Sequence, residues 1–117
     1  MSKSTQIKTE LPGPKSRELV ARREASMPAG YAKSTPLAVK RARGAMVEDM
    51  DGNVLMDFTG GIGVLNVGHN AQAVVDAIKA QADELIHACG LVATTEPHVA
   101  LAEKLCAITP ISGHKKA

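Results

Sequence analysis

The local fold of this chain is decided by residues 45–58, Ala45-Met46-Val47-Glu48-Asp49-Met50-Asp51-Gly52-Asn53-Val54-Leu55-Met56-Asp57-Phe58. This stretch contains two runs in which apolar and polar residues roughly alternate, and Asp51-Gly52 joins them. An Asp-Gly pair between such runs is a strong signal of a β-hairpin. A short extended run precedes the hairpin, so residues 36–58 are predicted to form a small antiparallel meander.

A glycine-rich segment follows the hairpin. Residues 59–70 read TGGIGVLNVGHN, with glycines at positions 60, 61, 63 and 68. Glycine permits a positive φ or the close approach of a ligand or another backbone, so tight packing and a ligand-lining loop both stay open. The segment has neither the P-loop spacing nor the G-x-G-x-x-G spacing of nucleotide-binding motifs.

Before the hairpin, the sequence predicts a lead and a helix. Residues 1–14 are polar and end in Pro12-Gly13-Pro14, which indicates a disordered lead. Residues 15–26, KSRELVARREAS, are good helix formers, but Leu19 and Val20 are their only strong apolar positions. This helix should therefore lie on a larger body rather than build a core of its own.

Two further helices are predicted after the glycine-rich segment. Residues 71–87 place Val74, Ile78 and Leu85 on one face, and Asn70 is a favourable N-cap. Residues 96–109 begin with Glu96-Pro97, where proline suits the first turn. The pattern contains no parallel sheet for these helices to cover, so the architecture is expected to be incomplete and to unfold with weak cooperativity.

Composition limits the class of protein. The 117 residues include 14 Lys/Arg and 12 Asp/Glu, a net charge of +2, with 44% hydrophobic residues but only two aromatic ones, Tyr31 and Phe58. No apolar run approaches the roughly 18 residues of a membrane span, and the start has no secretory pattern. Scattered basic residues with few aromatics disfavour nucleic-acid binding. A soluble cytoplasmic protein is expected.

Several side chains are candidates for catalysis or metal binding. A zinc site could be assembled from four residues, but no C-x-x-C or H-x-x-x-H pair supports it, so none is expected: His87, Cys89, His98 and Cys106. His69 is interpreted as structural rather than as a base. Asp49, Asp51 and Asp57 resemble a carboxylate cluster, yet the turn explains Asp51, and the other two suit polar strand positions. The basic run 40–43 is interpreted as a solvated edge.

The order and spacing of motifs from Val20 to about Pro110 resemble class III (subgroup II) pyridoxal-phosphate-dependent aminotransferases, and within them most of all 4-aminobutyrate aminotransferases. The motifs are Arg22-Arg23-Glu24-Ala25; Gly44-x-x-Val47-x-Asp49-x-Asp51-Gly52; Met56-Asp57-Phe58-x-Gly60-Gly61-Ile62-x-Val64-Leu65-Asn66-x-Gly68-His69; Val74-Val75-x-Ala77-Ile78-x-x-Gln81; His87-x-Cys89; and Glu96-Pro97 ahead of Leu101-Ala102-Glu103-x-Leu105.

The resemblance implies a fold class and a division of the chain. The class is α/β, as the N-terminal segment of the fold-type I architecture: a helix, a small antiparallel meander, then helices of the large domain. After the disordered lead 1–14, residues 15–70 would belong to the minor domain. Residues 71–117 would begin the large cofactor-binding domain, which is truncated here. The family acts as homodimers with active sites at the subunit interface.

The resemblance also implies an activity. The family uses pyridoxal 5'-phosphate to transfer an amino group from an amine, often an ω-amine, to a 2-oxo acid such as 2-oxoglutarate. Its lysine and other cofactor-binding residues would follow Ala117, so no catalytic, cofactor or metal residue is assigned and this chain alone is expected to be inactive.

The resemblance assigns few functional residues to positions of this sequence. Ile62 aligns with an apolar residue of the substrate pocket, and Leu91 falls where some members carry glutamine near the substrate. The family usually has His-Pro where this sequence has Ala71-Gln72. Acetylornithine, ornithine and β-alanine aminotransferases share much of the pattern and stay open as alternatives, as does a non-catalytic interaction module.

Overall fold

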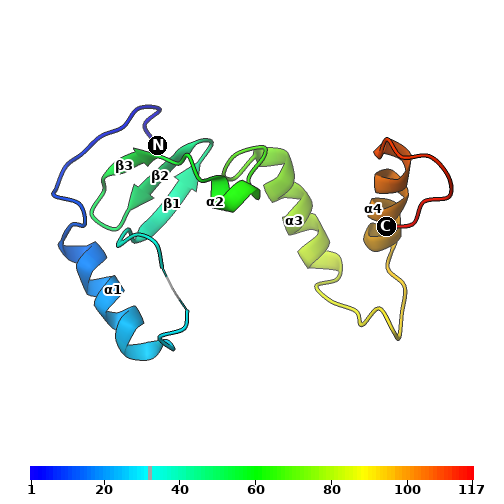
Figure 1. Ribbon diagram of the computed structural model, residues 1–117, viewed down its shortest axis with the longest axis horizontal. Coiled ribbons are helices and arrows are strands. Elements are labelled where there is room, and N and C mark those ends of the chain that lie inside the picture. The colour runs from blue at the N-terminus through cyan, green and yellow to red at the C-terminus, as the bar shows by residue number, and fades with distance from the viewer. Residues whose placement is uncertain (32) are drawn as a thin grey trace. The chain divides into compact units, whose positions relative to one another are not determined.

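The computed structural model describes residues 1–31 and 33–117, and Figure 1 shows its helices and strands in chain order. The chain divides into two compact units, Met1–Asp76 and Ala77–Ala117. The first unit contains helix α1 (Pro14–Ser26), a three-stranded sheet and the short turn α2 (Gly60–Gly63). Helix α3 (Gln72–Glu84) begins in the first unit and ends in the second, which also contains α4 (Glu96–Ile108).

The predicted meander is confirmed. Strands β1 (Val39–Arg43), β2 (Met46–Asp49) and β3 (Val54–Met56) form one antiparallel sheet in the order β1-β2-β3. The turn between β2 and β3 is at Asp51-Gly52, and Gly52 has a φ of +85°, which glycine adopts without steric cost. The basic run 40–43 lies on β1, where its side chains are exposed or half-buried, as predicted for a solvated edge.

The core of the first unit is small and partly polar. Its buried apolar residues are Ala38, Met46, Val47 and Val54. Asp49, the last residue of β2, and Asn53, which directly precedes β3, are completely buried, with 0% exposure. The Asp49 carboxylate accepts hydrogen bonds from the backbone N–H groups of Asp51 and Asn53 at 2.9 and 2.8 Å, and from Nδ2 of Asn53 at 2.7 Å. These bonds fix the β2–β3 turn.

The predicted disorder of residues 1–14 is wrong, because the hairpin supplies partners for this segment. Oδ1 of Asn53 accepts the backbone N–H groups of Lys8 and Thr9 at 2.7 and 2.9 Å, and Asn53 Nδ2 donates to Thr9 Oγ1 at 2.9 Å. Gln6 pairs with Val54 of β3 through two backbone hydrogen bonds of 2.9 and 2.8 Å. Composition gave no sign of these partners, which lie more than forty residues away in the chain.

Helix α1 confirms the predicted helix, and the hairpin turn provides its N-terminal cap. Asp51 Oδ1 accepts the N–H of Lys15, while Oδ2 accepts the N–H and the hydroxyl of Ser16, at 2.7–2.9 Å. A carboxylate satisfies free N–H groups and complements the positive end of the helix dipole. Desolvation raises the pKa of Asp51, but hydrogen bonds from Ser16 and Lys15 outweigh it and hold that pKa below its usual range.

The later helices lie close to their predicted ranges, with two differences. Helix α3 ends at Glu84, three residues before the predicted end at residue 87. Asn70 does not cap it: Asn70 has a φ of +51°, and its side chain donates to the carbonyl of Ala42. The carbonyl of Ala71 instead accepts the first helical bonds, from Val74 and Val75. The left-handed backbone of Asn70 directs its amide back to β1.

Neither α3 nor α4 contains a buried residue in the structure. Ile78 of α3 is 63% exposed and Leu101 of α4 is 57% exposed, although both occupy the predicted apolar faces. This exposure agrees with the sequence pattern, which contains no parallel sheet for these helices to cover. No helix within 1–31 and 33–117 has the length and apolarity that crossing a membrane requires.

Candidate functional site

The glycine loop, defined as residues 58–68, begins at an aspartate that binds its backbone. Asp57 directly follows β3, and its N–H donates to the carbonyl of Ala45 at 2.8 Å. Its Oδ1 accepts three hydrogen bonds, from the N–H and hydroxyl of Thr59 at 2.8 and 2.7 Å and from the N–H of Gly60 at 3.0 Å. One carboxylate oxygen therefore holds the first turn of the loop.

The loop ends at a histidine that faces the same aspartate. His69 exchanges two backbone hydrogen bonds with Gly44, at 2.9 and 2.8 Å, which attach the end of the loop to the β1–β2 turn. Its Nε2 lies 2.7 Å from Oδ2 of Asp57. Asp57 and His69 thus join the two ends of the glycine loop, as in an Ω-loop, whose ends are close and whose interior is compact.

The pair is largely shielded from solvent. The side chains of His69 and Asp57 are 21% and 12% exposed. The Thr59 hydroxyl, followed by the His69 ring and the Thr59 N–H, holds the pKa of Asp57 well below its usual range. Asp57 therefore stays ionised at neutral pH and acts as an acceptor for the loop, not as a general acid.

Acid should weaken this arrangement. Because the pKa of Asp57 is lower in the folded chain than in the unfolded one, its contribution to stability is present above the unfolded value of about 4 and is lost as the pH falls further. Asp51 and Glu48 are shifted in the same direction.

We therefore expect the free energy of unfolding of the first unit to decrease from about pH 5 downward. Denaturant unfolding followed by circular dichroism between pH 3 and pH 7 measures this change. In Asp57→Asn the decrease should be smaller. Equal slopes in the two proteins would contradict the contribution assigned to Asp57.

The tip of the loop has a left-handed backbone. Within α2, Gly61 has φ 65° and ψ 33°, and Ile62 has φ 59° and ψ 53°. A β-branched residue with a positive φ is a rare and strained conformation. A Cβ added to Gly60 or Gly63 would meet nothing within 4 Å, so these two glycines are explained by their positive φ and not by packing. Gly68 differs, because its Cβ would lie 3.1 Å from the Gly44 carbonyl oxygen.

The two residues predicted to contact substrate lie in different units. Ile62, in the first unit, is 95% exposed, and Leu91, in the second, is 98% exposed. Leu91 lies in the connection between α3 and α4, where the N–H groups of Val92 and Ala93 donate to the carbonyl of Cys89. Both predicted residues are thus presented on turns with their side chains in solvent.

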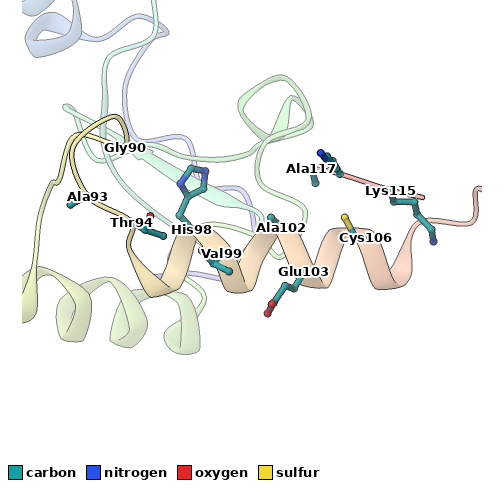
Figure 2. Close-up of a pocket in the computed structure, with 11 residues that line it drawn as sticks. Gly90, Ala93, Thr94, His98, Val99, Ala102, Glu103, Cys106, Lys115 and Ala117 are labelled. Carbon is teal, nitrogen blue, oxygen red and sulfur yellow. The ribbon is translucent and has the colours of Figure 1, made fainter. Parts of the chain in front are cut away.

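A hollow of about 600 Å³ lies along α4 in the second unit. Figure 2 shows His98, Ala102 and Cys106 following one another along one side of the helix, with Lys115 and Ala117 contributed by the last segment. Leu91 does not line this hollow. Outside Ala32, the structure brings no three His, Cys, Asp or Glu side chains together in a way that could hold a metal ion.

The three aspartates that resemble a carboxylate cluster in the sequence have separate roles in the structure. Asp49 is buried in the β2–β3 turn, Asp51 caps α1, and Asp57 holds the glycine loop. The prediction of a polar strand position is confirmed for Asp49, the last residue of β2. It is wrong for Asp57, which follows β3 and binds backbone groups of the next turn. Sequence reasoning considered Asp57 and His69 separately and missed their pairing. Only the glycines between them indicated a loop that could bring them together.

Comparison with known proteins places this chain in a family. The family model "Aminotransferase class-III" matches residues 27–115. A 4-aminobutyrate aminotransferase of Mycobacterium leprae is 42% identical over 117 residues, which are 100% of this chain and 26% of that protein. A 5-aminovalerate aminotransferase of Pseudomonas putida is 40% identical over 98 residues, covering 84% of this chain and 23% of that protein.

Solved structures of aminotransferases are also similar to this chain. N-acetylornithine aminotransferase from Stenotrophomonas maltophilia superposes with a TM-score of 0.64 at 30% identity, over 75% of this chain and 22% of that one. The chain spans about a quarter of the length of the curated relatives that it matches.

Proposed function

Because this chain belongs to the class-III aminotransferase family, we propose that it is the N-terminal portion of an enzyme that moves an amino group from an ω-amine such as 4-aminobutyrate to 2-oxoglutarate with pyridoxal 5'-phosphate. The similarity to a 4-aminobutyrate aminotransferase along all 117 residues carries this proposal. The complete enzyme would be a cytoplasmic homodimer. Residues 15–70 would belong to its minor domain, and residues 71–117 would open its large domain.

The described side chains of this chain do not by themselves fit the cofactor. A pyridoxal site needs a lysine and an aromatic ring that covers the pyridine ring, but the hollow along α4 is lined by Lys115 and Lys116 and by no Phe, Tyr or Trp side chain. The cofactor supplies the electron sink for the reaction when it is bound. We assign no residue of this chain to hold it.

Ile62 and Leu91 are proposed to contact the substrate. Their side chains carry no polar atom, so they would contact the methylene groups of an ω-amine and not its charged ends. Their exposure, 95% and 98%, leaves both side chains free to do so. The 4-aminobutyrate and 5-aminovalerate relatives differ in substrate length, and apolar contacts of this kind discriminate only modestly between chains that differ by one methylene.

The native mass is the first test. In cells that express this protein, an antibody raised against residues 1–76 should detect a species several-fold larger than 12.2 kDa. That species, purified, should form glutamate from 2-oxoglutarate and 4-aminobutyrate when pyridoxal phosphate is added. The purified 117-residue chain should form none above the rate of a blank without protein.

Two results would contradict the proposal. Clear turnover by the 117-residue chain would show that residues present here suffice for the reaction. A native species of 12.2 kDa that is inactive would instead favour a non-catalytic interaction module, with the exposed apolar faces of α3 and α4 as its contact surface. Co-purification with a complete aminotransferase would then identify its partner.

A further inference from the structure

We propose that Asp57 and His69 form a latch that closes the glycine loop and holds the left-handed turn at Ile62 in the conformation that contacts the substrate. The two residues act as positioning residues: neither would touch the reacting atoms. The inference rests on the proposed function only for the identity of the ligand, the methylene chain of an ω-amine.

Several hydrogen bonds converge on the latch. Asp57 accepts three hydrogen bonds from Thr59 and Gly60 through one oxygen and faces His69 Nε2 at 2.7 Å with the other. Bonds to a charged acceptor are stronger than those between neutral groups. The backbone of His69 is itself fixed on Gly44. Both ends of the loop are therefore tied to the sheet and to each other.

The latch maintains a strained backbone at the tip of the loop. Ile62 has φ 59° and ψ 53°, a conformation in which a β-branched side chain is unfavourable. Strained backbone persists only where its surroundings over-determine it, and it is concentrated at functional positions. No burial of the side chain compensates for the strain, since Ile62 is 95% exposed.

The glycine loop presents an apolar surface to solvent. Four apolar side chains of the glycine loop are exposed by 71–95%: Phe58, Ile62, Val64 and Val67. The loop offers no charged side chain between Asp57 and His69. A surface of this kind suits the hydrocarbon part of a ligand and leaves the charged ends of an ω-amine to other groups. A rigid loop binds such a chain with less loss of entropy than a mobile one.

Hydrogen exchange in the 117-residue chain tests the latch without any assay of activity. In His69→Ala and in Asp57→Asn, we expect the loop amides with hydrogen-bond partners, at positions 59, 60, 65 and 68, to exchange about tenfold faster. Amides of β2 and β3 should change little. His69→Gln, which keeps a side-chain donor, should restore part of the protection. His98→Ala on α4 is the matched control and should leave the loop unchanged.

Kinetics of the native enzyme test the effect on substrate. A positioning role predicts that His69→Ala raises the KM for 4-aminobutyrate about tenfold, changes kcat less than about threefold, and reduces the preference between 4-aminobutyrate and 5-aminovalerate. His69→Gln should be intermediate.

The outcomes of the two experiments separate the latch, the substrate contact and the proposed function. Unchanged exchange at positions 59–68 in both variants would overturn the latch, whatever the enzyme does. Faster exchange with an unchanged KM would overturn the substrate contact, and a fall in kcat with an unchanged KM would place the pair in the chemistry instead. If the native protein has no aminotransferase activity, the proposed function fails, while the exchange experiment still decides the latch.

Discussion

Replacing Asn53 with alanine is expected to destabilise the first unit by about 3 kcal/mol. The Asn53 side chain is completely buried and makes four hydrogen bonds, to the N–H groups of Lys8 and Thr9, to Thr9 Oγ1 and to Asp49 Oδ2. Alanine would leave two N–H groups and one carboxylate oxygen without these partners. A buried polar group left unpaired, as the Asp49 oxygen would be, costs about 1–3 kcal/mol. Water can reach the part-buried N–H groups of Lys8 and Thr9 and recover part of their cost.

Denaturant unfolding followed by far-ultraviolet circular dichroism measures the change. The matched control is Asn66→Ala, because Asn66 is an exposed asparagine of the glycine loop and its replacement should change stability by less than about 0.5 kcal/mol. Hydrogen exchange adds a local measurement: the amides of residues 6, 8 and 9 should lose their protection in Asn53→Ala. An Asn53→Ala chain as stable as the Asn66→Ala chain would contradict the bonding described for the core.

Gly13→Ala is expected to cost about 1–3 kcal/mol through steric overlap. A Cβ on Gly13 would lie 2.4 Å from Cγ of Asp51 and 2.7 Å from Oγ1 of Thr9. Asp51 cannot move away without breaking its bonds to Lys15 and Ser16, which cap α1. The substitution should therefore reduce the helix content of residues 14–26 as well as the stability of the first unit.

Gly30→Ala is the control for this substitution. A Cβ at Gly30 would meet nothing within 4 Å, and Gly30 is not among the residues of positive φ. We expect Gly30→Ala to be neutral or slightly stabilising, because alanine restricts the unfolded chain. Equal stabilities of the two variants, by circular dichroism in denaturant, would show that Asp51 does not contact residue 13 as described.

The elements of this chain follow from local sequence signals. Asp51-Gly52 between two apolar runs predicts the β2–β3 hairpin, and Pro14 and Pro97 stand in the first turns of α1 and α4, where a missing N–H has no cost. The pattern of motifs also predicts the family. These signals depend on residues a few positions apart, so they can be recognised without knowing the fold.

The tertiary contacts were not predictable in the same way. Asp51 and Lys15 are 36 residues apart, and Asn53 and Lys8 are 45 residues apart. An aspartate in a hairpin turn has an ordinary local explanation, so nothing in the sequence indicates that it also caps a distant helix. The disorder predicted for residues 1–14 failed for this reason: their partners are side chains of the hairpin.

The sequence by itself therefore determined the helices, the meander and the family of this protein. Only the tertiary structure decided that Asp51 caps the distant helix α1, and that Asp57 meets His69 across the glycine loop. The physical reason is the range of the interactions. Helix and strand propensities and hydrophobic periodicity act within one turn or strand, whereas a carboxylate accepts hydrogen bonds from whichever donors the fold brings within reach.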